Sequence, residues 1–250
     1  MTGPSRTPVV RSVAVPVVRP VMRMRWEALT YLHWDVDPDR LARELPPGLE
    51  PDVHDGRAWI GLIPFRMAAI TIGRGLRLPF GSFPETNVRT YVVGPDGGRG
   101  VYFHSLDITH LAPTVVARTT YRLPYCWSRM TIGRRGDEVG YLARRRWPGP
   151  VGATSRVVVR VGDRLRADEV TPLDDFLSAR WSLYETTPSG TILRASVDHD
   201  PWPLRQATLV SCDDGFVAAA GYPELTGRTP THVRYGGDVD VRVGPPRRVG

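Results

Sequence analysis

The chain has 250 residues, of which 41% are hydrophobic and 24% charged, with 25 Gly and 24 Pro. This length can bury a sizeable core, and the high Gly and Pro content favours many short strands and turns over long helices. All 33 basic residues are arginine, since the sequence contains no lysine. Every mechanism that requires a lysine Schiff base is therefore excluded.

The net charge of +7 raises the question of nucleic-acid binding. Nucleic-acid binders usually concentrate basic residues on one face or in one run. Here the arginines are scattered apart from two short runs, Arg144–Arg146 and Arg247-Arg248. We therefore expect no nucleic-acid partner, and a small-molecule ligand instead. The sequence leaves open whether the chain forms a homo-oligomer.

The apolar stretch at residues 9–22 is interrupted by arginines and prolines and is too short to span a membrane. We therefore expect no membrane partner and a cytoplasmic location. Cys126 and Cys212 have no CxxC neighbour, and the histidines show neither HxH nor HxxxH spacing. These patterns predict neither a metal site nor a cofactor.

The first third of the chain reads as a flexible tail followed by long strands. Residues 1–21 are rich in proline and show no clear period, so a tail is predicted there. A strand is expected at Trp26–Val36, and a short helix after it, capped by Asp37 with Pro38 in its first turn. Ala58–Ile72 is apolar enough for a long buried strand, or for two strands that break at Pro64.

The middle of the chain predicts a hairpin, a short helix and a further strand. The turn sequence Pro95-Asp96-Gly97-Gly98 separates strands expected at Asn87–Val93 and Val101–Leu106. A helix is predicted at Leu111–Arg118, and a strand at Trp127–Gly133.

The last part predicts more antiparallel strands, at Val139–Arg146, Ser155–Val161 and Gly190–Val197. Leu173–Tyr184 has apolar residues at helical spacing behind Thr171-Pro172, which predicts a helix. Ala207–Cys212 reads as a final core element. From Gly227 onward the chain is polar and rich in turn residues, and a tail is expected at residues 242–250.

These elements predict a mainly β (α+β) fold with one domain at residues 22–241: a curved, largely antiparallel barrel or cone with a central pocket and a few outer helices. Glu85, Arg89 and Tyr91 lie at i, i+4 and i+6 of one predicted strand. Their side chains therefore share one face of the sheet, which is either a site or a solvent-facing surface. Tyr102 and Ser105 alternate on the hairpin partner, so one of these two faces points inward.

Several other side chains have both a structural and a functional reading. Arg118 follows an apolar run, so it pairs either with a carboxylate such as Glu85 or with an acidic substrate. His33 is either a general base or a core histidine. Tyr102 is either a core tyrosine or a ligand contact. Cys126 is a nucleophile only if a basic group lowers its pKa, and otherwise an inert buried thiol.

A set of motifs resembles the acetoacetate-decarboxylase-like superfamily, and within it the YqjF-like family, known as domain of unknown function 2071. The motifs extend over roughly residues 22–241 and comprise His33-Trp34, the W-x-G-x-x-P-F segment Trp59–Phe65, E-x-N-V-R-x-Y-V at Glu85–Val92, G-V-Y-F-x-S-L-D at Gly100–Asp107, Ala117-Arg118, Leu123–Tyr125 and H-x-P-W-P-L at His199–Leu204.

The resemblance implies the curved β fold with an internal pocket, and it breaks at the catalytic position. In the decarboxylases a Pro-Lys-Lys segment supplies the Schiff-base lysine and a neighbour that lowers its pKa. Here Tyr125 stands at the Schiff-base position and Cys126 at its neighbour. One of the two pocket glutamates matches Glu85, whereas the other falls near Gly61. Decarboxylation through an iminium is thus excluded.

The remaining hypothesis is a pocket for a small oxo or carboxylic acid. Glu85 and Tyr125 are the candidate catalytic residues, through lyase-like acid–base chemistry that uses no lysine. The candidate substrate-binding residues are Arg89, Tyr102, Arg118, His33, Ser105 and Cys126. The alternative is a non-catalytic ligand-binding or structural protein on the same fold.

Overall fold

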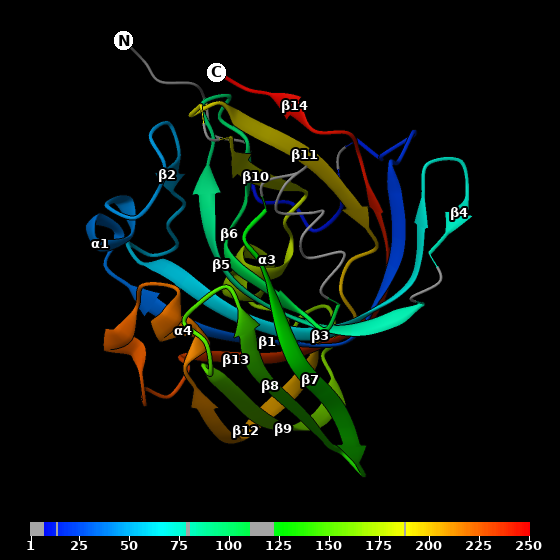
Figure 1. Cartoon of the computed structure of the whole chain (residues 1–250), viewed down its shortest axis with the longest axis vertical. Helices are drawn as coiled ribbons and strands as arrows, with labels where there is room; N and C mark the ends of the chain where they lie inside the picture. Colours follow the sequence, from blue (N-terminus) through cyan, green and yellow to red (C-terminus); the bar gives the residue numbers. More distant parts are fainter. Residues whose placement is uncertain (1–7, 14, 79–80, 111–122, 188) are drawn as a thin grey trace.

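The structure is a computed structural model that describes residues 8–13, 15–78, 81–110, 123–187 and 189–250. One large sheet dominates it (Figure 1). The strands of its first half are β1 (Met22–Val36), β2 (Glu50–Pro51), β3 (Ala58–Ile72), β4 (Leu76–Arg77), β5 (Ser82–Val93) and β6 (Arg99–Ile108). The later strands are β7 (Tyr125–Arg135), β8 (Glu138–Trp147), β9 (Thr154–Arg164), β10 (Ser182–Thr186), β11 (Ile192–His199), β12 (Arg205–Asp214), β13 (His232–Val243) and β14 (Arg247–Arg248).

The sheet closes on itself in two rings that share five strands. Among the described residues, β1, β3, β5, β6, β10, β11 and β13 form the first ring, which is closed by the β11–β13 and β5–β6 pairings. The second ring leaves β6 through β7, β8, β9 and β12 and returns at β13. Figure 1 shows β10 and β11 on one side of β1, β3 and β13, and β7, β8, β9 and β12 on the other. The expected mainly β fold is confirmed, as a curved sheet rather than a single regular barrel.

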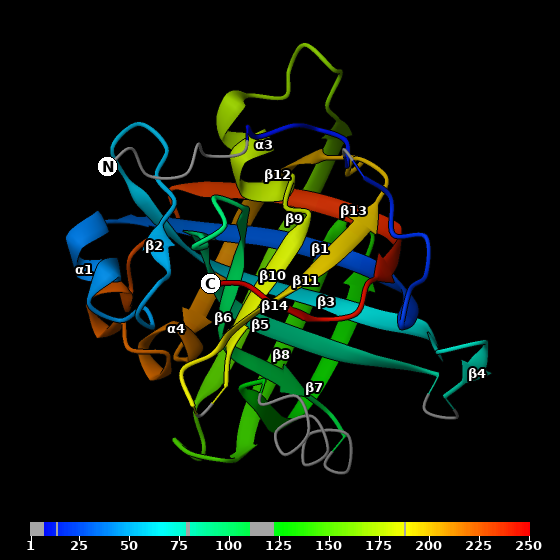
Figure 2. The ribbon, with the colours of Figure 1, turned by 90° about the horizontal axis from the view of Figure 1, so that it is seen from above.

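Short helices cover the ends of the two rings. Helix α3 (Pro172–Ser178) precedes β10 and packs Phe176 and Leu177 against the first ring. Helix α1 (Pro38–Ala42), helix α4 (Phe216–Ala219) and the 3₁₀ turn η2 (Pro223–Leu225) lie together at one side of the molecule (Figures 1 and 2). Their apolar residues join the core of the second ring.

Two irregularities in the strands decide which side chains face the inside of the first ring. In β1 the register shifts between Trp26 and Leu29, and Ala28 between them has φ of 51°. Both Trp26 and Leu29 therefore face the first ring, although strict alternation would place them on opposite faces. In the β5–β6 pair Val88 lies opposite Ser105 and Arg89 opposite Phe103, which is a second bulge.

Both predicted helix starts are confirmed. The Asp37 side chain accepts a hydrogen bond from the backbone N–H of Arg40 at 3.0 Å, with Pro38 in the first turn of α1. Thr171 and Asp174 form a reciprocal capping box at the start of α3. The predicted helix at Leu111–Arg118 lies outside the described residues.

The prediction of one helix over Leu173–Tyr184 was wrong in its second half. Helix α3 ends at Ser178, and β10 begins at Ser182, where it pairs with β11 and β6. The apolar spacing suits a helix, but neighbouring strands offer these residues a complete ladder of hydrogen bonds. Non-local pairing of this kind is invisible in the local period.

The ends of the chain take part in the fold. The polar stretch after Gly227 contains β13, which pairs with β1, β11 and β12 and runs past residue 241 to Val243. Strand β14 pairs with β11 inside the segment expected to be a tail. At the other end, the backbone N–H of Val17 donates to Asp198 at 3.1 Å, and Arg11 forms an ion pair with Asp175. Ala207–Cys212 lies in β12, whose residues are exposed or half-buried rather than core.

Candidate active site inside the first ring

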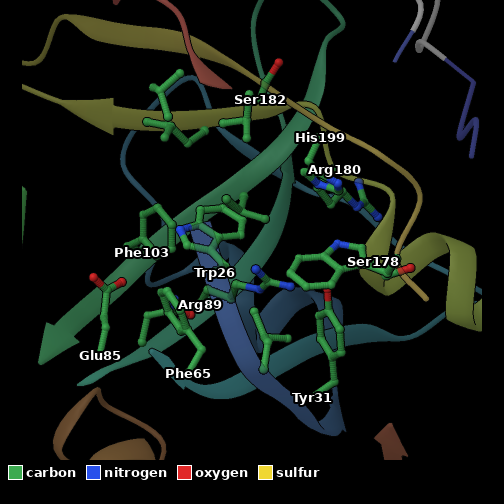
Figure 3. Close-up of a pocket in the computed structure, with 17 residues that line it drawn as sticks. Trp26, Tyr31, Phe65, Glu85, Arg89, Phe103, Ser178, Arg180, Ser182 and His199 are labelled. Atoms are coloured by element: carbon green, nitrogen blue, oxygen red, sulfur yellow. The ribbon is translucent and has the colours of Figure 1, made fainter. Parts of the chain in front are cut away.

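A cavity of about 70 Å³ lies inside the first ring. Every strand of that ring contributes to its wall, and α3 closes one end through Ser178. Its apolar wall contains Trp26, Phe65, Phe103 and Trp202, and its polar groups gather on β5 and after α3 (Figure 3). We refer to this space as the inner cavity.

Strand β5 supplies a row of three polar side chains to the inner cavity: Glu85, Asn87 and Arg89. They alternate along the strand and therefore point to one side, together with Tyr91, as the sequence predicts. Each carries a buried polar atom that has no hydrogen-bond partner among the described residues, namely Glu85 Oε2, Asn87 Oδ1 and Arg89 Nε. Buried polar atoms are normally paired, so this row is a place where a ligand can supply the missing partners.

Glu85 is a buried carboxyl group with a raised pKa. Only 3% of its surface is exposed, and burial raises its pKa to about 8, although a hydrogen bond with Asn87 acts in the opposite direction. The negative charge of Asp107 adds to the rise in the pKa. Glu85 can therefore donate a proton or a hydrogen bond to an acceptor in the cavity.

Arg89 is a buried guanidinium that lacks a carboxylate partner in the described part of the chain. Its Nη2 donates to Tyr91 Oη and to the Leu177 carbonyl, each at 3.3 Å. The rings of Tyr31 and Tyr91 lie 5.5 Å from its Cζ. These neutral contacts hold the guanidinium in place and leave its charge available for an anion.

Arg180 adds a second buried guanidinium on the same side of the cavity. Figure 3 shows Arg180 near His199, away from Glu85. Arg180 pairs with Asp52 at 2.5 Å, and Arg99 pairs with the same carboxylate at 2.6 Å. The single carboxylate of Asp52 thus pairs with both Arg180 and Arg99. Together with Arg89, these arginines give the Arg180 end of the cavity an excess of positive charge.

Tyr125 lies beside the Glu85 end of the cavity. In the sheet, Tyr125 lies opposite Leu106 of β6, and Leu106 lies opposite Asn87 of β5. The side chains of Tyr125, Leu106 and Asn87 therefore lie on the same face of the sheet. Burial raises the pKa of Tyr125 well above its ordinary value, and the charges of Glu85 and Glu185 add to the rise. Tyr125 therefore remains a neutral phenol, which can donate a hydrogen bond but is a poor proton acceptor.

His33 lies behind Arg89 rather than in the cavity. Its Nε2 is 2.6 Å from Tyr91 Oη, its Nδ1 is 3.3 Å from His232 Nδ1, and His232 Nε2 is 2.8 Å from Asp174. Burial lowers the pKa of His33 well below its ordinary value, and the positive charges around it act in the same direction. His33 is a neutral ring that positions Tyr91, and Tyr91 accepts a hydrogen bond from Arg89.

The structure separates three other predicted residues from the inner cavity. The β5–β6 bulge turns Ser105 toward the second ring, where it accepts a hydrogen bond from Arg145 at 3.2 Å. Cys126 pairs with Asp107 and lies on the side opposite Tyr125. Tyr102 packs against the core of the second ring. Arg118 lies outside the described residues.

Sequence reasoning did not find Arg180, Asn87, His199 or Trp202 as cavity residues. The Nδ1 atom of His199 lies 2.7 Å from the Asp200 carbonyl oxygen, and the side chain also lines the cavity. The H-x-P-W-P-L motif that contains His199 and Trp202 was the available signal. Arg180 gave none, because it follows a short helix whose end was misplaced.

Neither a metal site nor a membrane-spanning helix is found in the part of the chain that the structure describes. No three His, Cys, Asp or Glu side chains there are grouped to hold a metal ion. None of its helices has the length and apolar character needed to cross a bilayer.

Comparison with known families gives a match over most of the chain. The family model DUF2071, described as an uncharacterized conserved protein, matches residues 23–240. The uncharacterized protein YqjF of Bacillus subtilis is 33% identical over 201 residues, which cover 79% of this chain and 80% of that protein.

Comparison with solved structures shows the fold. The acetoacetate decarboxylase of Legionella pneumophila superposes with a TM-score of 0.65 at 14% identity, covering 100% of this chain and 98% of that one. The enduracididine biosynthesis enzyme MppR in complex with pyruvate has a TM-score of 0.58 at 16% identity and covers 100% and 99% of the two chains. The chain therefore has the acetoacetate-decarboxylase-like fold.

Proposed function

Since the chain belongs to the DUF2071 family and has the acetoacetate-decarboxylase-like fold, we propose that it binds a small oxo acid in the inner cavity. Arg89 receives the carboxylate of the ligand. The protonated Glu85 donates a hydrogen bond to the carbonyl oxygen, and Tyr125 lies beside it. This arrangement is suited to acid–base chemistry at the carbon next to the carbonyl, without a lysine.

The observation that carries the proposal is the row of polar atoms on β5 that have no hydrogen-bond partner among the described residues. It combines an acid with a raised pKa at one end with a guanidinium that has no described carboxylate partner at the other. A ligand with an anionic group and a neutral acceptor complements both ends at once. A simple cation or an apolar ligand would leave either Arg89 or Glu85 without a partner.

The spacing along β5 constrains the ligand further. Glu85 and Arg89 are four residues apart, which separates their Cα atoms by roughly 13 Å along a strand. Both side chains reach toward the cavity, but a ligand whose carbonyl adjoins its carboxylate spans little of this separation. We therefore expect levulinate, whose ketone and carboxylate are separated by two methylene groups, to bind more tightly than pyruvate.

The fold relatives support the class of ligand. MppR was solved in complex with pyruvate, an oxo acid. Because identity to that enzyme is only 16%, the residues that hold the ligand must be argued from this chain itself. In this chain, we assign the binding of the ligand's carboxylate group to Arg89.

The proposal is tested by titrating levulinate and pyruvate into the wild type, Arg89→Met and Glu85→Gln, with calorimetry as the measurement. Arg144→Met is the matched control, because Arg144 is exposed on β8. We expect Arg89→Met to weaken levulinate binding by about 10- to 100-fold, from the loss of hydrogen bonds to a charged group. If neither oxo acid binds the wild type, or if Arg89→Met binds as tightly, the proposal is wrong.

A non-catalytic ligand-binding protein is the second candidate. The observation that favours it is the aromatic wall, in which Trp26 stacks on Trp202 with ring centroids 6.0 Å apart and Trp26 also meets Phe65 at 5.6 Å. These rings leave a cavity of only about 70 Å³. Binding of levulinate without any turnover or proton exchange would support this candidate.

A further inference from the structure

We propose that a groove beside β11 binds a fatty acid, with its carboxylate on arginines near the β5–β6 turn and its alkyl chain against the N-terminal segment. The inference concerns a second site and does not depend on the function proposed for the inner cavity. The groove has a volume of about 660 Å³, which lies within the usual range for small-molecule sites. We refer to it as the N-terminal groove.

The floor of the N-terminal groove is the side of β11 that faces away from the core of the first ring. Arg194 and Ser196 line the groove, whereas Ala195 between them belongs to that core. The walls come from the described residues of the segment 8–19 and from residues 244–247, near the two ends of the chain. The groove is therefore separate from the inner cavity and has its own set of side chains.

The N-terminal wall is held against the first ring by hydrogen bonds near both of its ends. The Trp181 indole donates to the Val10 carbonyl oxygen at 2.9 Å, and the backbone N–H of Val17 donates to Asp198 at 3.1 Å. These bonds fix the wall to the body of the protein, so the groove is a feature of the fold.

Valine side chains of the N-terminal wall remain in contact with solvent. Val10, Val15 and Val18 line the groove, and their exposed fractions are 38%, 76% and 86%. Apolar side chains that stay exposed and gather in one hollow are typical of a binding site. An alkyl chain in the groove would remove these side chains from water, which favours its binding.

The charged side chains that line the groove are all positive in the described part of the chain. They are four arginines, namely Arg19, Arg99, Arg194 and Arg247. The Asp52 carboxylate, which pairs with Arg99 at 2.6 Å, is shared with Arg180 and cannot neutralise both guanidinium groups. The groove therefore has an excess of positive charge, which attracts an anion.

The pairing of β11 with β14 places two of these arginines directly opposite each other. Arg194 lies opposite Arg247, and Asp96 Oδ2 is 2.7 Å from the first guanidinium and 3.9 Å from the second. Like charges opposite each other on neighbouring strands are destabilising, and one carboxylate compensates only one of them. A Cβ atom at Gly98 would clash with Arg194 Nη1, so this guanidinium lies against the β5–β6 turn, one residue from Arg99. A second anion at this turn would relieve the repulsion.

The arginines and the valines together define the class of ligand. An inorganic anion would leave the valines exposed to water, and an uncharged alkyl chain would leave the arginines without a second anion. A fatty acid complements both, because its carboxylate accepts charge-assisted hydrogen bonds and its chain covers the apolar wall. A bilayer surface is a poorer match. The side chains of Arg99 and Arg194 are only 21% and 20% exposed, so lipid headgroups in a flat membrane would not reach them easily.

The test titrates decanoate into the full chain by calorimetry, below the concentration at which decanoate aggregates. We expect Arg247→Met to weaken decanoate binding by about fivefold, and high salt to weaken binding to the wild type, because both reduce the attraction of the carboxylate. The matched control is Arg248→Met. Arg248 is the other residue of β14, and alternation turns its side chain away from the groove, which it does not line.

The apolar half of the groove is tested in the same way. Val15→Ser should weaken decanoate binding by about threefold, because less apolar surface is buried by the ligand. The control is Val151→Ser, which changes a valine that is 70% exposed and does not line the groove. On the wild type, decanol and butyrate should each bind at least about tenfold more weakly than decanoate, since decanol lacks the charge and butyrate has a shorter chain.

Three results would overturn the fatty-acid site: no binding of decanoate by the wild type, equal losses in Arg247→Met and Arg248→Met, or decanol binding as tight as decanoate. Binding to phosphatidylglycerol vesicles that decanoate does not displace would make this face a membrane contact instead. Levulinate binding by Arg247→Met should equal that of the wild type, so failure at one site leaves the other proposal intact. Thermal melting of each variant establishes that it is folded.

Discussion

The two rings differ in how completely their buried charged side chains are paired. In the second ring, Asp107 accepts from Arg145 Nε at 2.9 Å and Nη2 at 2.6 Å and from Ser128 at 2.6 Å, so its carboxylate is fully engaged. In the first ring, Glu85 and Arg89 do not pair with each other, and each has one buried atom without a hydrogen-bond partner in the described part of the chain. Both sets of residues lie on strands β5–β8, within one continuous sheet.

This difference distinguishes a structural charge from a functional one. A buried ion pair with complete hydrogen bonding holds strands together and offers nothing to a ligand. A buried acid and a buried guanidinium kept apart by apolar rings destabilise the folded protein when the cavity is empty. A ligand that binds both relieves that destabilisation. The comparison can be tested ring by ring.

The largest expected effect is in the second ring. Arg145→Met leaves the Asp107 carboxylate buried without its main partner, and should lower the free energy of unfolding by about 3–5 kcal/mol. Urea denaturation measures the change. Arg144→Met, one residue away and exposed, should change stability by less than about 0.5 kcal/mol. An Arg145→Met protein as stable as the wild type would contradict the structural role.

The next effect is the pH dependence caused by Glu85. Its pKa is about 8 in the folded chain against an ordinary value of 4.5. Between these values the unfolded chain releases a proton that the folded chain retains, so the free energy of unfolding falls as the pH rises, and it levels off above about pH 8. Between pH 6 and pH 8 this fall amounts to roughly 2–3 kcal/mol, at about 1.4 kcal/mol per pH unit where only the unfolded chain is ionised, and Glu85→Gln should remove it.

The measurement for Glu85 is urea denaturation at several values between pH 5 and pH 9. Glu138→Gln is the control, because Glu138 is paired with Arg160 at the surface. Parallel pH profiles for the wild type and Glu85→Gln would mean that Glu85 is ionised in the folded chain at neutral pH.

A smaller effect is expected at Ser105, a residue that the sequence proposed for the site and the structure assigns to the second ring. Ser105→Ala removes one acceptor from Arg145 and should lower stability by about 1 kcal/mol. Levulinate binding should be unchanged, because the side chain points away from the inner cavity. If Ser105→Ala lost levulinate binding but kept the stability of the wild type, Ser105 would have to be part of the binding site.

The smallest expected effect on stability is that of Arg89→Met, the counterpart of Arg145→Met in the first ring. Because no described carboxylate is left behind, and the methionine keeps much of the apolar stem, stability should stay within about 1 kcal/mol of the wild type. A loss of 3 kcal/mol or more in thermal or urea unfolding would show that Arg89 is structural. The comparison between the two rings would then fail.

Much of the fold follows from local patterns in the chain. The long apolar run of β3, the hairpin turn between β5 and β6, and the Asp37 and Thr171 helix caps were all predicted and are present. Of the site, the shared face of Glu85, Arg89 and Tyr91 was predicted from strand alternation alone. Arg180 was not, because its neighbours come from segments that are distant in sequence.

By itself, the sequence excluded one reaction mechanism and identified one strand, β5, that contributes side chains to the site. A chain without lysine cannot form a lysine Schiff base, and alternation places the polar row of β5 on one face. The tertiary structure decided the rest, because bulges and strand pairings depend on non-local hydrogen bonds. They turned Ser105 away, brought Arg180 to the wall of the inner cavity, and left Glu85 and Arg89 each with one buried atom that has no hydrogen-bond partner among the described residues.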